Sequence, residues 1–221
     1  MNIIGDIVNI FGLLGYLFAI MSFLYFNKIK VFIWVNKIFS WKKDVNFELS
    51  LVAANKDVNL EAVLRTFRES INYESKIMMR SNNKIIFSLD TLIVEIRNDD
   101  FPEMEYNFEI LIKNMNSSYS VAEKNLKILQ KIFNTIIYDL ELKNVKFTFK
   151  SVFPKNNPFL GPAVTKIGVD KIKRFYMIVS TEAFTNKLYN GEKIQVNLNE
   201  ISYVDNNFED LRDVANIILS I

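Results

Sequence analysis

The hydrophobic and polar positions divide the chain into three parts. An almost unbroken apolar run covers residues 3–26, and a shorter stretch that mixes aromatic and aliphatic residues with lysines follows it. Beyond these, the pattern changes between strand-like alternation and helix-like periods. We therefore predict a transmembrane anchor over residues 1–26, a basic interfacial or juxtamembrane helix over 27–43, and one α+β domain over 44–221.

The apolar run is long enough to cross a bilayer. As an α-helix rising about 1.5 Å per residue it would extend about 36 Å, against a hydrocarbon core of about 30 Å. Its one charged residue, Asp6, and its one strongly polar residue, Asn9, both lie in its first third. The run lacks the basic start and small-residue cleavage site of a secretory signal peptide, so we expect an uncleaved anchor. The alternative is a buried core helix of the domain.

The distribution of lysines predicts the orientation of this anchor. Every lysine of the first 43 residues follows the apolar run: Lys28, Lys30, Lys37, Lys42 and Lys43. The positive-inside rule then places the N-terminus outside the cell and the C-terminal domain in the cytoplasm. Tyr25, Trp34 and Trp41 lie on the basic side, where an aromatic belt is expected. We expect a single-pass protein of the cell membrane.

Small residues form a stripe along one face of the anchor helix: Gly12, Gly15, Ala19 and Ser22. Such a stripe lets a second helix backbone approach closely, so we expect self-association into a homo-oligomer. Asp6 and Asn9 would line a polar path between the helices, because ionisable residues in spans often mark function. Two plainer interpretations stay open: glycine is frequent in membrane helices, and Asp6 can lie in the outer headgroup layer.

Residues 27–43 are too short and too rich in lysine for a second span. They are typical of an amphipathic helix at the membrane interface or of a cytoplasmic continuation of the anchor. A helix packed on the soluble domain is the competing interpretation.

The remaining pattern predicts an α+β domain. Strands are expected near residues 45–54, 76–80, 84–97 with a break at Asp90, 105–114, 145–153, 174–180, 193–198 and 201–205, and helices over 59–71, 119–140 and 208–218. Asn59 and Ser118 or Ser120 are suited to cap the first two helices, and Glu61 to pair with Arg65. Consecutive antiparallel strands with few helices predict a curved sheet that carries its helices on one face.

The order of elements over residues 45–153 resembles curved-sheet domains of the TATA-binding-like or helix-grip kind. This is a resemblance of pattern alone, and it implies an antiparallel sheet with helices on one side. No sequence repeat and no linker rich in glycine, proline or serine divides the domain.

The absence of cysteine and histidine excludes much chemistry. It rules out Ser-His-Asp triads, Cys-His pairs and ordinary zinc sites. Since no phosphate-binding glycine loop or nucleophile elbow is present either, we predict that the protein is not an enzyme and needs no cofactor or metal. The acidic group Asp99, Asp100, Glu103 and Glu105 has no metal-loop spacing and is better read as a solvated turn.

A loop over residues 153–168 carries three of the four prolines and two of the six glycines. We predict that it borders a pocket for an anionic small molecule, with these ligand-binding residues: Lys155, Asn156, Asn157, Lys166 and Arg174. The alternative is a plain surface connection between strands.

Charge is distributed unevenly. The first 43 residues hold five lysines against Asp6, a net charge of +4, which leaves 22 of the 27 basic and 24 of the 25 acidic residues, a net −2, to the domain. The domain therefore lacks the basic excess of general nucleic-acid binders.

These features favour a membrane protein whose cytoplasmic domain senses a ligand, such as an anionic small molecule or nucleotide, and signals through a self-associating span. In architecture this resembles small bacterial antiviral-defence effectors that join a nucleotide-sensing domain to one or two spans. One alternative is a membrane-tethered scaffold that binds a protein partner by strand addition. Another is an enzyme that uses carboxylates and a metal ion.

Overall fold

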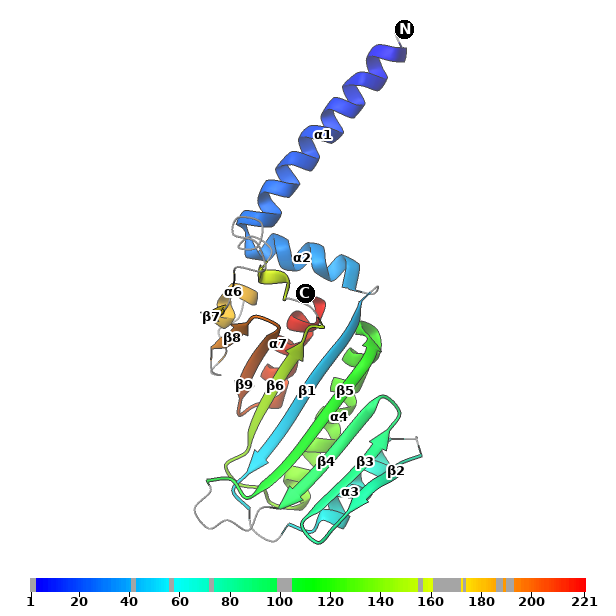
Figure 1. Cartoon of the computed structure of the whole chain (residues 1–221), viewed down its shortest axis with the longest axis vertical. Helices are drawn as coiled ribbons and strands as arrows, with labels where there is room; N and C mark the ends of the chain where they lie inside the picture. Colours follow the sequence, from blue (N-terminus) through cyan, green and yellow to red (C-terminus); the bar gives the residue numbers. More distant parts are fainter. Residues whose placement is uncertain are drawn as a thin grey trace.

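The computed structural model describes residues 3–40, 43–55, 58–71, 74–98, 105–154, 157–160, 172, 174–185, 189 and 193–221, with side chains described from Ile10 onward. A long helix, α1 (Ile3–Asn27), projects away from the rest of the molecule, and a second helix, α2 (Ile29–Phe39), lies across the end of a large sheet (Figure 1). Helices α3 (Leu60–Ser70), α4 (Tyr119–Asp139) and α7 (Phe208–Ser220) lie behind this sheet. The protein is therefore an α+β fold with one projecting apolar helix.

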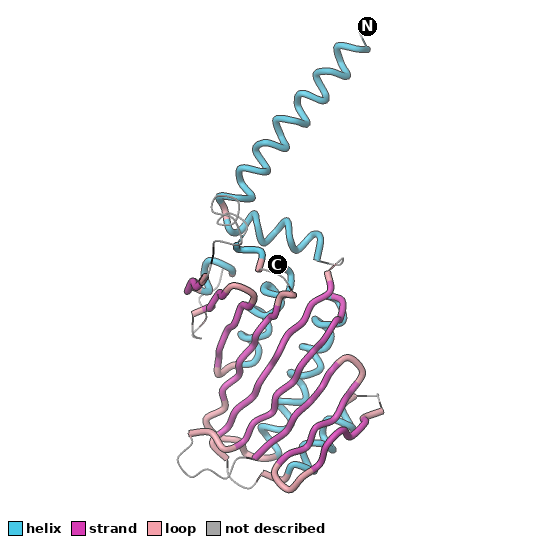
Figure 2. The backbone as a smooth tube through the Cα atoms, viewed as in Figure 1, coloured by secondary structure: helices cyan, strands magenta, loops and turns pink. Residues whose placement is uncertain are grey.

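The described strands form one curved antiparallel sheet in the order β2-β3-β4-β5-β1-β6-β9-β8-β7 (Figure 2). Their bounds are β1 (Asp44–Ala53), β2 (Lys76–Arg80), β3 (Lys84–Leu89), β4 (Leu92–Asn98), β5 (Phe108–Ser118), β6 (Lys146–Val152), β7 (Tyr176–Val179), β8 (Ile194–Asn197) and β9 (Glu200–Asp205). Most strands alternate between buried and half-buried residues, because one face packs on helices and the other does not.

The sheet has two halves, β1 to β5 and β6 to β9, and each half ends in a strand that leads into a long helix. No sequence repeat indicated this similarity. β1 and β6 pair at the centre, β5 flanks β1, and β9 flanks β6. β5 leads directly into α4, and β9 leads into α7 through a two-residue turn. The two helices run antiparallel, since Tyr119 at the start of α4 donates to the carbonyl of Asn216 near the end of α7 (3.5 Å). This arrangement brings the start of α4 and the end of α7 together beneath α2.

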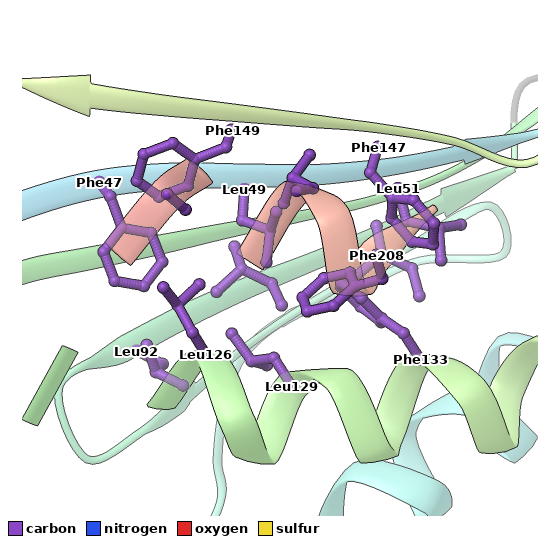
Figure 3. Close-up of a cluster of buried hydrophobic side chains, with 14 of the residues drawn as sticks. Phe47, Leu49, Leu51, Leu92, Leu126, Leu129, Phe133, Phe147, Phe149 and Phe208 are labelled. Atoms are coloured by element: carbon purple, nitrogen blue, oxygen red, sulfur yellow. The ribbon is translucent and has the colours of Figure 1, made fainter. Parts of the chain in front are cut away.

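Aromatic side chains fill the core between the sheet and its helices. Phe208 of α7 packs against both Phe147 of β6 and Phe133 of α4, with ring centroids 5.1 and 5.3 Å away, and Phe133 lies 5.9 Å from Phe147 (Figure 3). All three rings are buried, and the adjoining leucines of β1 and α4 close the space around them. Burial of side chains of this size contributes about 1.5–3 kcal/mol each, so this layer holds the sheet and the two helices as one body.

Several local predictions are confirmed. The side chain of Asn59 caps α3 by accepting hydrogen bonds from the backbone amides of Glu61 and Ala62 (3.0 and 3.2 Å). Ser118, one of the two candidates, caps α4 by accepting from the amide of Val121 (3.4 Å). The expected break near Asp90 is the β3–β4 turn, where this residue has φ 51°, a conformation that aspartate tolerates.

Two further expectations need correction. Glu61 does not pair with Arg65: it binds Arg80 of β2 at 2.7 Å, while Arg65 lies 3.9 Å from Glu69. The sequence spacing allowed the helical pair, but the edge strand brings a guanidinium closer. The fifth strand was expected over residues 105–114 and in fact runs through Ser118 up to the helix cap.

The anchor helix and the stretch after it form two helices rather than one. The backbone is extended at Lys28 (φ −127°, ψ 108°), which separates α1 from α2. Over Ile10–Asn27, α1 is long and apolar enough to span a membrane, and none of this segment is buried in the protein, so it is not a core helix of the domain. In the described part of the chain it is the one helix with these properties.

We predict that Phe133→Ala lowers the free energy of unfolding by about 3–5 kcal/mol, because it leaves a cavity between three elements. For a chain of this size the melting temperature should fall by about 6–20 °C. Circular dichroism of the full chain in detergent micelles measures this. Tyr138→Ala, which removes an aromatic ring that is 83% exposed on the same helix, is the matched control and should melt like the unmodified protein. Equal melting of both variants would contradict the packing described.

Candidate functional site

Aromatic rings connect the projecting helix to the domain. Phe32 of α2 is buried, with its ring centroid 5.1 Å from that of Tyr25 in α1 and 5.1 Å from that of Phe159. Phe159 belongs to the short helix η2 (Pro158–Leu160) and contacts Phe184 of α6 (Thr181–Phe184) at 5.4 Å. These four rings form a continuous chain from α1 to the domain, so the direction of α1 is set by how α2 docks (Figure 1).

A lysine completes the attachment of α2 on the opposite flank. Lys43, just before β1, donates from Nζ to Asn36 Oδ1 of α2 (2.9 Å) and to the carbonyl oxygens of Ser220 (3.4 Å) and Ile221. Asn36 in turn donates to the hydroxyl of Tyr25 (3.3 Å). A cation suits this place because the last carbonyls of α7 lack partners within the helix and carry the negative end of its dipole. Burial lowers the pKa of Lys43.

A cavity of about 740 Å³ lies between α2 and the helices of the domain. Its lining comes from α2, the start of α4, the segment around α6 and the end of α7; the residues that carry polar groups are Lys30, Lys37, Ser40, Tyr119, Glu123, Thr185, Tyr189, Asp213 and Asn216. Trp34 and Phe184 supply aromatic walls. This volume is within the range of about 300–1,000 Å³ that is usual for small-molecule sites.

The charges around the cavity favour an anion. Glu123 lies 3.1 Å from Lys127, and Asp213 lies 3.1 Å from Arg212. Both acidic side chains of the lining therefore have a basic neighbour, and Lys37 adds positive charge from α2. The first turn of α4, where the helix dipole is positive, also reaches the cavity through Tyr119.

Two tyrosines and an asparagine whose side-chain oxygen is unpaired among the described residues complete the lining. Burial, with the nearby carboxylate of Glu123, raises the pKa of Tyr119, and burial with the carboxylate of Asp213 raises that of Tyr189. Both phenols therefore keep their protons at neutral pH; Tyr119 donates a hydrogen bond to the carbonyl of Asn216 (3.5 Å), and both hydroxyl oxygens can accept hydrogen bonds. The Oδ1 atom of Asn216 is buried without a hydrogen-bond partner in the described part of the chain. A ligand that donates a hydrogen bond would satisfy this atom.

Two of the five ligand-binding residues predicted from the sequence, Asn157 and Arg174, are in the described part of the chain. Lys155, Asn156 and Lys166 lie outside the described residues, so that site stays a prediction.

Asn157 is 1% exposed. Its side-chain amide donates to the carbonyls of Asn197, at the end of β8, and Leu198 (3.5 Å), and its Oδ1 accepts from the backbone amide of Phe159 (2.8 Å). The described role of Asn157 is to hold Phe159 beneath α2. Arg174 is exposed just before β7.

The predicted association stripe on α1 is open. A side chain added at Gly12 or Gly15 would meet nothing within 4 Å, and Ala19 is exposed. Ser22 is half-buried. The side chains of Asp6 and Asn9 are outside the described part of the structure, so the polar path stays a prediction.

The uncovered face of the sheet has a mixed charge. In the described residues, cross-strand ion pairs join Lys84 to Glu95 (2.6 Å), Arg97 to Glu109 (2.5 Å), Lys113 to Glu48 (3.4 Å) and Lys150 to Glu200 (3.7 Å). A surface on which lysine and arginine are each matched by glutamate has little net attraction for phosphate backbones. The described residues also include no group of three carboxylates placed to hold a metal ion.

The cavity residues were missed by sequence reasoning because they come from four separate segments. One signal did exist: Tyr119, Glu123, Asp213, Asn216 and Ile217 are neighbours at spacings of three and four on their helices, just off the faces that form the core. Without the antiparallel packing of α4 and α7, nothing in the sequence indicated that these two stripes meet. No protein-family model matches the chain, and no curated protein matches it significantly.

We predict that Lys43→Met loosens the docking of α2, because it leaves the Asn36 side chain and the backbone oxygens of Ser220 and Ile221 without their donor. The loss should be about 1–2 kcal/mol of docking free energy, on the scale of one or two net hydrogen bonds. Hydrogen–deuterium exchange of the full chain in nanodiscs measures this as faster exchange of the α2 amides.

Lys124→Met, at an exposed lysine on α4, is the matched control and should exchange like the unmodified protein. Strands β3 and β4 should keep their protection in both variants, because they lie away from α2 (Figure 1). Unchanged protection of α2 in Lys43→Met would contradict this account of the docking.

Proposed function

We propose that this chain is a single-pass membrane protein whose domain binds an anionic small molecule, such as a nucleotide, in the cavity beneath α2 and transmits its presence to α1. The observation that carries this proposal is the position of the cavity. Its wall includes the same helix that is joined through Phe32 and Tyr25 to the projecting apolar helix. A ligand bound there would touch the connecting element directly.

The chemistry of the lining supports the class of ligand. Lys30 and Lys37 can bind phosphate or carboxylate groups, while the phenol oxygen of Tyr189 and the side chain of Asn216 offer acceptors for polar edges. Phe184 is suited to contact a planar ring. A nucleotide combines all three features in a volume that this cavity can hold.

Coupling requires that the ligand prefer one position of α2. Because two of the binding lysines belong to α2 and the other polar groups belong to the domain, a ligand makes its full set of contacts only when α2 is docked. A ligand that binds the docked state more tightly than the released state by about 5.5 kcal/mol would move α2 from about 1% docked to about 99% docked. A smaller difference is enough for a partial change in the docking of α2. The direction of α1 would change with it.

Three features support the membrane part of the proposal. α1 is apolar, unburied and long enough to cross the bilayer. The lysines that follow it favour a cytoplasmic domain by the positive-inside rule. The open stripe at Gly12, Gly15 and Ala19 suits a second copy of the helix, so that a change in α1 would alter an oligomer. Membrane effectors of bacterial antiviral defence, which resemble this architecture, are the class that we propose.

We predict that a linear or cyclic nucleotide raises the melting temperature of the full chain in nanodiscs. At a concentration of about 100 times its dissociation constant, the ligand should stabilise the protein by about 2.7 kcal/mol, or about 5–11 °C. Lys37→Glu, an exposed substitution on the cavity wall, should abolish most of this shift by repelling the anion. Asn216→Leu should do the same by removing the buried acceptor.

Asn134→Leu, at an exposed position of α4, is the matched control and should keep the full shift. A shift that persists in both cavity variants would place the ligand elsewhere. If no nucleotide of the panel shifts the melting temperature, the ligand class proposed is wrong. The edge strand β2, with exposed Met78 and Met79, would then be the surface to test for a protein partner.

We predict that Gly15→Leu reduces self-association of α1, because a leucine side chain holds the helix backbones apart. Chemical crosslinking of the full chain in vesicles should show mostly monomer for this variant and oligomers for the unmodified protein. Leu17→Phe, a bulky change on the opposite face of α1, is the control and should crosslink normally. Equal crosslinking of both variants would exclude the small-residue stripe as the contact.

A further inference from the structure

Helix α2 has apolar residues on both of its sides. The side toward the domain carries Phe32, Ile33 and Asn36. At 3.6 residues per turn, the opposite side carries Ile38 and the half-buried Val31 and Val35, and Trp34 lies at the border between this side and the cavity. Trp34 and Ile38 are 57% and 46% exposed, and Phe39 at the helix end is 53% exposed.

An outward apolar side is unusual for a helix that already packs on a domain. A surface helix normally places charged or polar residues opposite its buried face. Here the polar residues of α2 lie on the flank, where Lys30 and Lys37 border the cavity. The exposed apolar side chains on the outward side of α2 would therefore be more stable in contact with an apolar environment than with water.

The neighbouring helix indicates what covers it. α1 ends at Asn27, two residues before α2 begins, and its last turns expose Phe23 (65%) and Phe26 (57%). α2 turns sharply away from α1 at Lys28 and runs across the top of the domain (Figure 1). A bilayer crossed by α1 would end at this level, so its surface would meet the outward side of α2.

The charges and the tryptophan favour a lipid surface over a second copy of the chain. From Ile7 to Lys43 the sequence has no acidic residue, while Lys28, Lys30 and Lys37 are all in or next to α2. Anionic headgroups attract such lysines by about 1 kcal/mol each, and tryptophan prefers the interface. Two copies that paired through this side would bring their lysines together and repel each other.

We propose that the outward side of α2 lies in the headgroup layer of an anionic bilayer, so that the domain sits directly against the membrane surface. This inference rests on the anchoring role of α1 in the proposed function and does not depend on a ligand in the cavity. The helix inserts its apolar side about 5–10 Å into the boundary between headgroups and acyl chains. Docking of α2 to the domain then takes place at the lipid surface.

Spin labels at three single cysteines test this in the full chain, whose natural sequence contains no cysteine. Phe18→Cys reports on α1, Ile38→Cys on the outward side of α2, and Tyr138→Cys on an exposed position of the domain. Each labelled protein is reconstituted into vesicles of phosphatidylcholine alone or with about one third phosphatidylserine. Collision with oxygen reports lipid contact, and collision with a water-soluble nickel complex reports water contact.

The ratio of oxygen to nickel collisions should be highest at residue 18 and several-fold higher at residue 38 than at residue 138. It should rise further at residue 38 when phosphatidylserine is present. A value at residue 38 equal to that at residue 138, with residue 18 in lipid, would overturn this inference and leave the anchor intact. A value at residue 18 equal to that at residue 138 would overturn the anchor itself.

Two other results would also overturn the inference. Dipolar broadening between Ile38→Cys labels, with both collision reagents excluded, would show that a second copy covers the outward side of α2. A ratio at residue 38 that does not respond to phosphatidylserine would exclude anionic headgroups as the partner. Ile38→Asp provides an independent check, because a carboxylate at this position should release a label at Phe39→Cys into water.

Discussion

The packing of Phe32 between Tyr25 and Phe159 is the contact on which the arrangement of this molecule depends. Through α2 it joins the apolar helix α1 to the sheet and its helices. Aromatic pairs at such distances contribute about 0.5–1.5 kcal/mol beyond their buried area. These contacts favour one orientation of α1, and their free energy is small enough that binding of a ligand or of lipid could change that orientation.

The sheet provides the fixed side of this junction. β1 and β6 pair at its centre, and the antiparallel helices α4 and α7 cover them with an aromatic core. Such a core is packed as densely as an organic crystal and deforms little. Any movement is therefore concentrated where α2 rests on the ends of these elements, through Phe32 on one flank and Lys43 on the other. The cavity lies between α2 and the helices that pack on the sheet.

The described part of the predicted ligand loop supports α2. Asn157 is buried and bonded to backbone groups, and this bonding places Phe159 where Phe32 can contact it. Proline and asparagine indicate that a loop has a fixed backbone conformation, but they do not indicate which of its side chains contact a neighbouring element. Here the described part presents an aromatic ring to α2. The described polar groups that suit a ligand lie nearby, on α2, α4 and α7.

Local patterns in the sequence determined the elements of this protein, and tertiary packing decided the site. Asn59 and Ser118 cap their helices as predicted, because a cap depends only on residues two or three positions away. The pairing of Glu61 was not predictable in this way, since Arg80 approaches it from another element. The same holds for the cavity beneath α2, where Lys37, Tyr119 and Asn216 come from distant segments. Hydrophobic periodicity records which face of an element is buried, whereas the neighbours of that face depend on how all the elements share one core.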